Sequence, residues 1–312
     1  DLIEKKLDYE LEKIDSNNIR AISLNSPFYP HLLKNIHFPP PFLFAKGDLD
    51  LLKTDSIAIV GTRYPTDYGK KIAEKLAVDL SHNGITIISG LARGIDTIAH
   101  QGSISVEKGK TIAVLGNGLG VVYPKENKKL YQQIEENGLI ITELPFDMHP
   151  EKFNFPLRNR IVSGLSKGVV VVEAAEKSGA LITADYANEQ GRDVFAVPGE
   201  LTNPNASGTN NLIKEGAKIV LDAGDIIEEV FGLSKNFYIQ ENKKEKLLQN
   251  LDEEDNKIYE FIIQTHKPNF ETIAEKFCLD NMTLNILISR LLNLELKGFI
   301  KELPGKFYCN NL

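Results

Sequence analysis

Three turns that contain glycine, two of them with an arginine, follow successive apolar runs of the sequence. They are residues 61–63 (Gly-Thr-Arg), residues 89–96 (Ser-Gly-Leu-Ala-Arg-Gly-Ile-Asp) and residues 116–118 (Gly-Asn-Gly). Where such a turn leads into a helix, free backbone N–H groups favour an anion, and an arginine can hold a phosphate through two hydrogen bonds. The turns therefore predict phosphate-binding positions at Gly61, Thr62, Arg63, Ser89, Gly90, Arg93 and Gly116.

Each of these features also has a structural explanation. Glycine at a strand end permits a tight turn, and an arginine can form a surface salt bridge, for which Arg93 has Asp96 nearby. Glu173 and Glu189 could serve an enzyme, but isolated carboxylates more often hold loops by accepting backbone hydrogen bonds. We interpret His100 as structural and predict no catalytic residue.

A basic segment with interleaved aromatic residues, expected to form a loop, lies further along the chain. Residues 151–167 hold four basic residues and one acidic residue. Single-stranded nucleic acid needs this combination, because phosphates meet the cations while unstacked bases lie on aromatic faces. Alternatively, Phe153 and Phe155 fill the core and the arginines form a solvated face. The predicted positions are Lys152, Phe155, Arg158, Asn159 and Arg160, with Ser178 and Gly179 at the start of a later helix.

Between residues 56 and 233, short β-branched runs alternate with helix-length amphipathic segments. Several runs are apolar at consecutive positions, which is typical of parallel strands buried on both faces. The expected strands are residues 57–60, 85–89, 111–115, 139–142, 169–173, 194–197 and 218–221. The pattern predicts an α/β fold with a Rossmann-like, doubly wound and mostly parallel sheet. Ligands bind such sheets outside the carboxyl ends of the strands, where the glycine turns lie.

The chain is expected to divide into four segments. Residues 1–50 form an N-terminal leader, residues 51–233 the sheet domain and residues 234–250 a polar linker. Residues 251–312 show three helical patterns followed by two short strand patterns, which predicts a small winged-helix-like domain. Residues 241–312 hold ten Lys or Arg against twelve Asp or Glu, so we expect this domain to contact protein rather than a DNA groove.

Composition excludes several classes of protein. The apolar runs of the chain are too short for a membrane span, and the N-terminus lacks a signal-like apolar stretch. We therefore expect a cytoplasmic protein without membrane contact. Cys278 and Cys309 have no metal-ligand spacing, and neither a metal nor a cofactor is expected. The net charge of −7 opposes generic DNA binding, but a local basic strip still attracts phosphate because screening acts beyond about 8 Å.

Taken in order, the motifs resemble the DprA/Smf family of DNA-processing proteins from about residue 22 to residue 233. The resemblance implies a protein that binds incoming single-stranded DNA during natural transformation and loads the RecA recombinase onto it. Two departures are that most of the helical domain often found before this region is missing, and that residue 62 is Thr where Ser is frequent. The motifs are residues 60–63, 89–96, 113–116 with Tyr123-Pro124, 155–161, 178–180, 189–192, 197–199 and 208–213.

The resemblance also implies particular residues. The basic residues of the family's DNA pocket match Arg63, Lys125 and Lys152. Family members form homodimers through the segment that matches residues 210–219, where an apolar set is expected near the sheet edge. The predicted interface residues are Asn210, Leu212, Ile213 and Ile219. Alternatively, Leu212 belongs to the hydrophobic core.

Two enzymes are the rival interpretations. A related nucleotide phosphoribohydrolase would carry a compact Pro-Gly-Gly and Gly-Thr motif, but residues 201–207 separate Pro198-Gly199-Glu200 from Gly208-Thr209. A nicotinamide dehydrogenase would need a Gly-x-Gly-x-x-Gly turn and an acidic residue after the second strand, and the sequence lacks both. We therefore favour a binding protein over an enzyme.

Overall fold

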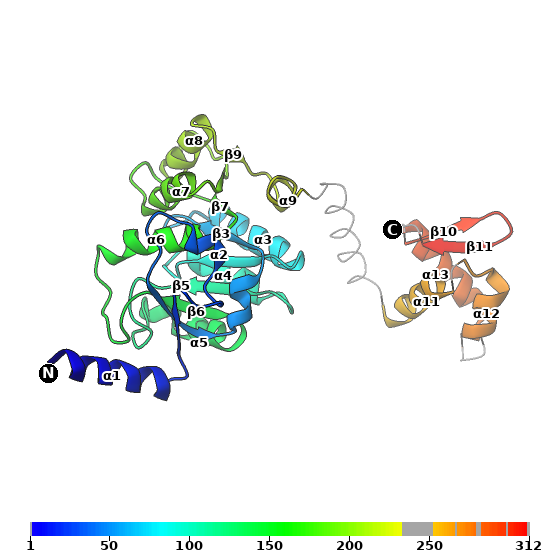
Figure 1. The fold of residues 1–312 in the computed structure, drawn as a ribbon. Helices are drawn as coiled ribbons and strands as arrows, with labels where there is room; N and C mark the ends of the chain where they lie inside the picture. The colour runs from blue at the N-terminus through cyan, green and yellow to red at the C-terminus, as the bar shows by residue number, and fades with distance from the viewer. Residues whose placement is uncertain (1, 233–251, 266, 279–281, 298, 311–312) are drawn as a thin grey trace. The chain divides into compact units, whose positions relative to one another are not determined.

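The computed structural model describes residues 2–232, 252–265, 267–278, 282–297 and 299–310. The chain separates into two compact units, residues 1–232 and residues 233–312 (Figure 1). The predicted linker at residues 234–250 falls outside the described residues. None of the described helices combines the length and apolar character that crossing a membrane requires.

The first unit is built on a nine-stranded sheet in the order β1-β2-β6-β5-β4-β3-β7-β8-β9. The strands from β6 to β9 in this order are parallel, whereas β1 and β2 pair antiparallel with each other and β2 pairs antiparallel with β6. The predicted Rossmann-like α/β fold is thereby confirmed. The strands are β1 (Arg20–Ser23), β2 (Phe42–Gly47), β3 (Ser56–Val60), β4 (Thr86–Ser89), β5 (Thr111–Val114), β6 (Leu139–Thr142), β7 (Gly168–Val171), β8 (Asp193–Ala196) and β9 (Lys218–Ile219).

Helices cover both faces of this sheet (Figure 1). All residues of β3 to β7 are buried, which explains why their sequences are apolar without alternation. One face packs on α6 and α7, and the opposite face on α5. The helices are α1 (Leu2–Ser16), α2 (His31–Lys34), α3 (Asp67–His82), α4 (Ile95–Ile104), α5 (Lys128–Asn137), α6 (Asn154–Leu165), α7 (Gly179–Glu189), α8 (Ser207–Lys214) and α9 (Ala223–Phe231), with 3-10 turns η1 (Leu49–Lys53), η2 (Lys125–Asn127) and η3 (Pro204–Ala206).

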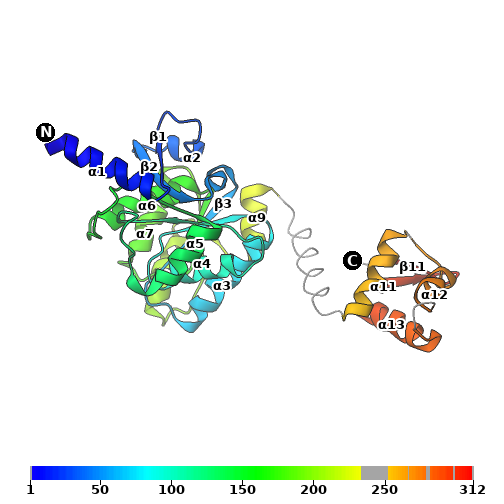
Figure 2. The same cartoon turned by 90° about the horizontal axis from the view of Figure 1, so that it is seen from below.

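Two sequence-based boundaries need correction. Residues 1–50 are not a separate leader, because β1 and β2 extend the sheet beyond β6 and Leu33 and Leu43 are fully buried in its core. Figure 2 shows β1, β2 and α2 together at one margin of the unit. The basic segment predicted as a loop forms α6 from Asn154 onward. Pro156 lies in the first turn of this helix, where proline is tolerated.

The described residues of the second unit form three helices and a two-stranded antiparallel hairpin. Its core is formed by apolar side chains that include Tyr259, Leu291 and Phe299. This order of elements agrees with the pattern from which the winged-helix-like domain is predicted. The elements are α11 (Glu253–Gln264), α12 (Phe270–Cys278), α13 (Leu284–Leu296), β10 (Ile300–Leu303) and β11 (Phe307–Asn310).

Candidate functional site

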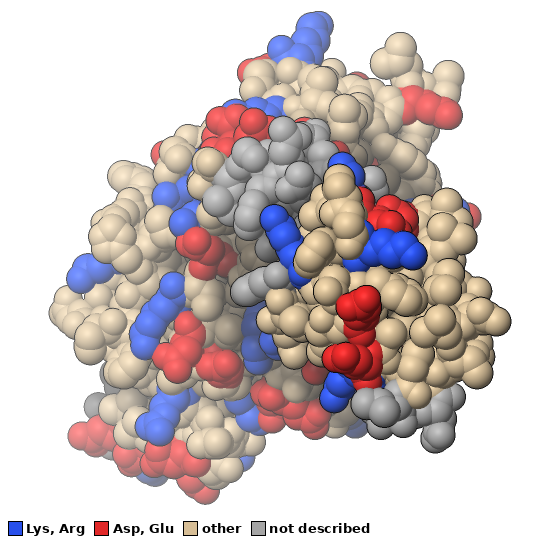
Figure 3. Space-filling view, turned by 90° about the vertical axis from the view of Figure 1, so that its right-hand side faces the viewer, with Lys and Arg blue, Asp and Glu red and all other residues tan. Residues whose placement is uncertain are grey.

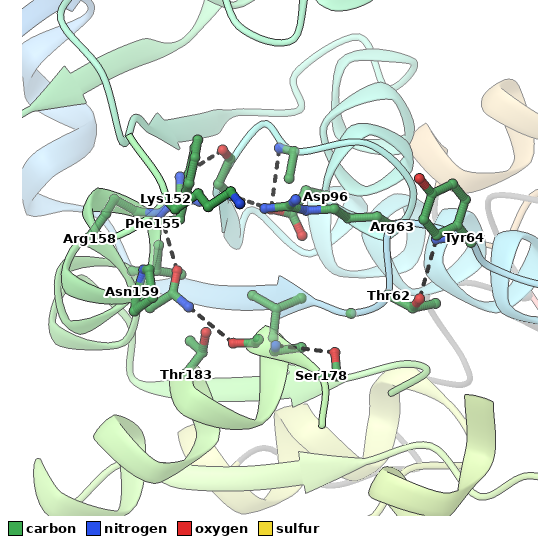
Figure 4. Close-up of a pocket in the computed structure, with 18 of the residues that line it drawn as sticks. Thr62, Arg63, Tyr64, Asp96, Lys152, Phe155, Arg158, Asn159, Ser178 and Thr183 are labelled. Carbon is green, nitrogen blue, oxygen red and sulfur yellow. Dashed lines mark hydrogen bonds between the residues drawn. The ribbon is translucent and has the colours of Figure 1, made fainter. Parts of the chain in front are cut away.

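A cavity of about 590 Å³ opens at the carboxyl ends of β3 and β4. β3 lies between β4 and β7 in the sheet, and the chain builds outward from β3 on one side before it crosses to the other. This reversal is the topological switch point at which doubly wound sheets bind ligands. The turns after β3 and β4 form part of the wall, and α6 and the start of α7 complete it (Figure 4).

Two exposed cations and an aromatic ring come together in this cavity. Arg63, Lys152 and Phe155 all line it (Figure 4). The Arg63 guanidinium lies over the Phe155 ring, 5.5 Å from its centroid, and the Tyr123 ring packs on Phe155 with centroids 5.6 Å apart. A guanidinium over an aromatic face is attracted by the ring electrons and keeps its N–H groups available for a phosphate.

A third cation, Arg158, lines the same cavity but is buried in its floor. Its Nη1 donates to the backbone carbonyls of Gly90 (2.7 Å) and Val114, at the ends of β4 and β5. Burial lowers the pKa of this guanidinium to about 10, partly offset by the charge of Asp96, so it remains protonated at neutral pH. Arg158 thus joins two strand ends to α6 while adding positive charge beneath the cavity.

Close packing around Arg158 accounts for the glycine at residue 90. A Cβ there would lie 2.5 to 2.6 Å from the Arg158 guanidinium atoms, so a larger residue would displace the arginine. Asp96 is also buried and accepts hydrogen bonds from the N–H groups of Gly90 (3.1 Å) and Ala92 (3.4 Å). Burial raises the pKa of Asp96, and Arg158 opposes this shift.

The wall across from Phe155 is formed by the start of α7 (Figure 4). The Asn159 Nδ2 on α6 donates to the Gly179 carbonyl (3.1 Å), and the Ser178 side chain caps α7 by accepting from the Ala180 N–H (3.3 Å). A Cβ at Gly179 would meet no atom within 4 Å. The helix N-terminus is therefore open to a ligand in the cavity, and its dipole favours an anion there.

The turn after β3 also lies in the wall. The Thr62 N–H donates to the Glu173 carbonyl (2.7 Å), and the Thr62 hydroxyl accepts from the Tyr64 N–H (3.2 Å). Gly61 and Thr62 both line the cavity. Glu173 is 2% exposed and accepts from the N–H (2.8 Å) and hydroxyl (2.5 Å) of Thr66, which is the loop-holding role interpreted from sequence.

Several predicted site residues lie elsewhere. Ser89 is fully buried and its hydroxyl donates to the Ile59 carbonyl (2.7 Å), so it is a core residue. Arg93 pairs with Glu126 (2.6 Å) and not with Asp96. Arg160 is held by Glu143 through two hydrogen bonds of 2.6 Å and does not line the cavity.

Two further predicted residues lie near its edge. Gly116 lies under Phe155, since a Cβ there would lie 2.8 Å from the ring, and both line a small adjoining cavity. Lys125 begins η2 and is exposed, directly after Tyr123 and Pro124 of that small cavity, but it lines neither space.

Sequence reasoning missed some lining residues. Tyr64 is 78% exposed beside Arg63, and Thr183 faces the cavity one turn into α7. Tyr64 followed a predicted phosphate residue directly, and an aromatic beside a basic residue is the signal that identified Phe155. His100 is fully buried with its Nδ1 2.6 Å from the Thr111 hydroxyl, as its structural interpretation requires.

The predicted interface residues occupy different environments. Leu212 is 6% exposed and belongs to the core, and the Asn210 side-chain amide exchanges two hydrogen bonds with the Gly199 backbone. Ile213 is partly buried against the same core, whereas Ile219 is 49% exposed on β9 at the sheet edge. Leu221, two residues beyond it, is 73% exposed.

The charges of the cavity differ from those of the wider surface. Among its described lining residues are three cations, Arg63, Lys152 and Arg158, and a single carboxylate, Asp96. On the face drawn in Figure 3, by contrast, basic and acidic side chains are interspersed. Within the described part of the chain, no group of three His, Cys, Asp or Glu side chains is placed to hold a metal ion.

Comparison with known proteins identifies the family of this chain. The family profile of DNA recombination-mediator protein A matches residues 20–231. The chain belongs to this family. The DNA processing protein DprA of Bacillus subtilis is 48% identical over 226 residues, which is 72% of this chain and 76% of that protein.

Two solved structures of DprA proteins resemble the first unit. The X-ray structure of DprA from Streptococcus pneumoniae has a TM-score of 0.69 at 44% identity, over 73% of this chain and 78% of that one. DprA from Helicobacter pylori, whose structure is described for its single-stranded DNA binding mode, has a TM-score of 0.62 at 34% identity. The match covers 69% of this chain and 96% of that one. The matched residues 20–231 include β1 and β2, in agreement with their place in the sheet.

Proposed function

We propose that this chain binds single-stranded DNA in the cavity at the ends of β3 and β4. Arg63 and Lys152 would each meet a phosphate, and a base would lie against Phe155. The observation that carries the proposal is the convergence of two exposed cations on one aromatic ring, the combination that single strands require. The single-stranded DNA binding of the Helicobacter pylori relative supports it.

The shape of the site favours a single strand over a duplex. Phe155 is partly buried within the cavity wall, so a base must leave its stack to reach the ring. Flipping a base out of a duplex costs a few kcal/mol, whereas a single strand offers unstacked bases without that penalty. The described lining of the cavity holds three cations and one carboxylate, so the phosphates are attracted locally despite a net charge of −7.

A binding function also fits the state of the carboxylates better than hydrolysis does. Asp96 is engaged by two backbone N–H groups, and Glu173 is buried and holds Thr66. Neither is positioned as a free general base on the cavity surface. We therefore propose that the chain is a mediator rather than an enzyme, that it works in the cytoplasm, and that it protects the strand and delivers it to the RecA recombinase.

We propose further that the chain acts as a homodimer through β9. An edge strand presents unpaired backbone groups to a second copy, and Ile219 and Leu221 add exposed apolar surface beside it. Two cavities in one dimer would hold two stretches of a strand, which raises the effective affinity without new contacts.

Gel-shift titrations of the full chain with single-stranded, double-stranded and mononucleotide ligands test the proposal. We expect tight binding of the single strand, weaker binding of the duplex and no turnover of the mononucleotide. Equal affinity for duplex and single strand, or hydrolysis of the mononucleotide, would contradict it. Stimulation of RecA filament formation on the bound strand tests the delivery step separately.

A further inference from the structure

A second cavity, of about 600 Å³, lies on the opposite flank of α6. Phe38, Phe153, Leu157 and Tyr186 give it a mainly apolar lining, and the first two are 68% and 66% exposed. It opens beside Leu115 and Leu144, just beyond β5 and β6. The site described above lies at the ends of β3 and β4, so the two cavities are neighbours along the same edge of the sheet.

Helix α6 separates the two cavities and supplies residues to both. Phe155, Asn159 and Val162, spaced by four and three residues, line the first cavity, whereas Asn154 and Leu157 line the second. These spacings place the two sets on different faces of one helix. Arg158 lines both cavities. Lys152 lines the first, and Phe153, the next residue, lines the second. A helix is about 10 Å across, so both cavities lie within reach of one short single strand.

The second cavity contains two buried polar atoms without a partner among the described residues. The Asn154 Nδ2, on a residue that is 6% exposed, has no acceptor, and the Gln190 Oε1 has no donor. The other amide atom of Gln190 is used, because its Nε2 donates to the Arg160 carbonyl (3.1 Å). Buried donors and acceptors are rarely left unpaired, since each costs free energy comparable to a lost hydrogen bond. Both atoms are themselves buried beneath the cavity surface, so a donor and an acceptor become available to a planar ring with polar edges when the two amide groups turn toward the cavity.

The charges of the second cavity exclude a phosphate as its occupant. Arg160 is neutralised by Glu143 through two hydrogen bonds of 2.6 Å, and Arg158 donates to strand carbonyls. Glu189 adds a further carboxylate to the lining. In the first cavity, Arg63 and Lys152 have no ion-pair partner among the described residues and can attract phosphates, whereas the second cavity offers aromatic faces to a neutral ring.

We propose that the second cavity is a nucleobase subsite, which receives a further base of the strand whose phosphates are held by Arg63 and Lys152. A base would stack between Phe38 and Phe153, and the Asn154 and Gln190 amides would turn toward its polar edge and gain the partners that they lack. This inference rests on the proposed binding of single-stranded DNA and adds to it a second point at which the strand is held, across α6 from the first.

Photocrosslinking of the full chain locates the bases directly. Short single strands that carry 5-iododeoxyuridine at one position are bound, irradiated and mapped by mass spectrometry, because this base reacts with aromatic side chains that it touches. We expect two classes of crosslink, one at Phe155 or Tyr123 and one at Phe38, Phe153 or Tyr186. Crosslinks confined to the first class would overturn the subsite.

Binding measurements supply a second readout. The double variant Phe38→Ala, Phe153→Ala should bind a normal strand about tenfold or more weakly, since stacking is lost, yet bind a fully abasic strand of equal length as the unaltered chain does. Phe28→Ala, which removes a 51% exposed aromatic outside both cavities, is the matched control and should change neither.

The outcomes separate the two proposals. Binding that depends on Arg63 and Lys152 but not on the aromatic pair would refute the subsite alone. An equal loss on normal and abasic strands would also refute it, because the pair would then not be holding a base. A chain that binds no single strand at all would overturn the subsite together with the proposed function.

Discussion

The guanidinium of Arg63 and the ring of Phe155 lie 5.5 Å apart, although the residues are far apart in sequence. Arg63 follows β3, and Phe155 lies in the first turn of α6, which precedes β7. Because β3, β6 and β7 are parallel, α6 begins at the carboxyl edge where β6 ends and runs back to the start of β7, so its first turn lies at the same edge as the turn after β3. The cation lies over a neutral ring and forms no ion pair among the described residues, although it is close enough to the buried Asp96 to offset part of the rise that burial causes in the pKa of that carboxyl. Its N–H groups therefore remain available to a phosphate.

The first prediction concerns the salt dependence of single-strand binding. If Arg63 and Lys152 each neutralise one phosphate, replacing either by Ala should flatten the slope of log affinity against log salt by roughly 0.7, the single-strand value per phosphate. The loss should be similar for all base sequences, because phosphate contacts carry no sequence information. Fluorescence anisotropy over a range of salt concentrations measures both quantities.

Two further variants control this experiment. Lys75→Ala removes a cation that pairs with Asp79 on α3, outside the cavity, and should leave the slope unchanged. Lys125→Ala tests whether the strand also passes over η2, in which case it flattens the slope like the other two. Unaltered slopes in the Arg63 and Lys152 variants would show that these residues are ordinary surface charges that do not contact phosphates.

The second prediction separates stacking from charge. Phe155→Ala should weaken single-strand binding by about 1–3 kcal/mol, the usual contribution of a stacked base, with little change in the salt slope. The same titrations measure it, and circular dichroism confirms the fold. Because Phe155 also supports Arg63, a slope that flattens along with the affinity would mean that the ring acts by positioning the cation and not by stacking.

Much of this site could be predicted from sequence because its residues border strongly apolar strands. The runs that became β3 to β9 are β-branched, and a doubly wound sheet brings their following turns together. Arg63, Lys152 and Phe155 could therefore be assigned to one edge before any coordinates. β1 and β2 could not be predicted in the same way, because β2 has the alternating burial of an outer strand and β1 buries only Ile22, so neither has a continuous apolar run.

The arginines that were wrongly predicted to face the cavity with a free charge have a different explanation. Sequence spacing places Arg93, Arg158 and Arg160 near the same strand ends but does not show which way each side chain turns. The structure points Arg158 inward to strand carbonyls, and the other two pair with Glu126 and Glu143. Partners this distant along the chain are fixed by tertiary packing, so a local basic pattern could not distinguish a free arginine from a paired one.

A third prediction follows from the inward direction of Arg158. Arg158→Met should lower the free energy of unfolding by about 2 kcal/mol or more, because two strand carbonyls, of Gly90 and Val114, lose a charged donor. Arg63→Ala, at an exposed position, should change it by less than about 0.5 kcal/mol. Urea unfolding followed by circular dichroism compares the two. Equal stability of both variants would show that the buried guanidinium is not a structural element.

The fourth prediction concerns stability in acid. Burial, aided by the charge of Arg158, lowers the pKa of His100 from 6.5 to about 3. The unfolded chain therefore binds more protons than the folded chain between these values. The contribution of His100 to the free energy of unfolding is therefore complete above pH 6.5. It is lost as pH falls below that value, by about 1.4 kcal/mol per pH unit.

His100→Gln should reduce that dependence, because glutamine does not titrate. Urea unfolding of both proteins at pH 4.5, 5.5 and 6.5 measures it, and the comparison between proteins cancels the carboxylates that also titrate in this range. A variant that loses stability with falling pH as steeply as the unaltered chain would contradict the buried, neutral state of His100.

The last prediction concerns the edge strand β9. If two copies associate there, Ile219→Glu should give a folded monomer, because a charge at a 49% exposed apolar position would be buried unpaired in the interface. Light scattering measures the mass, and Leu201→Glu, at a 94% exposed leucine outside β9, is the control that should remain dimeric. An unchanged dimer would place the interface elsewhere, whereas an unfolded Ile219 variant would assign the residue to the core. Because two linked cavities hold one strand more tightly than one, the monomer should also bind long single strands more weakly, while its affinity for short ones is retained.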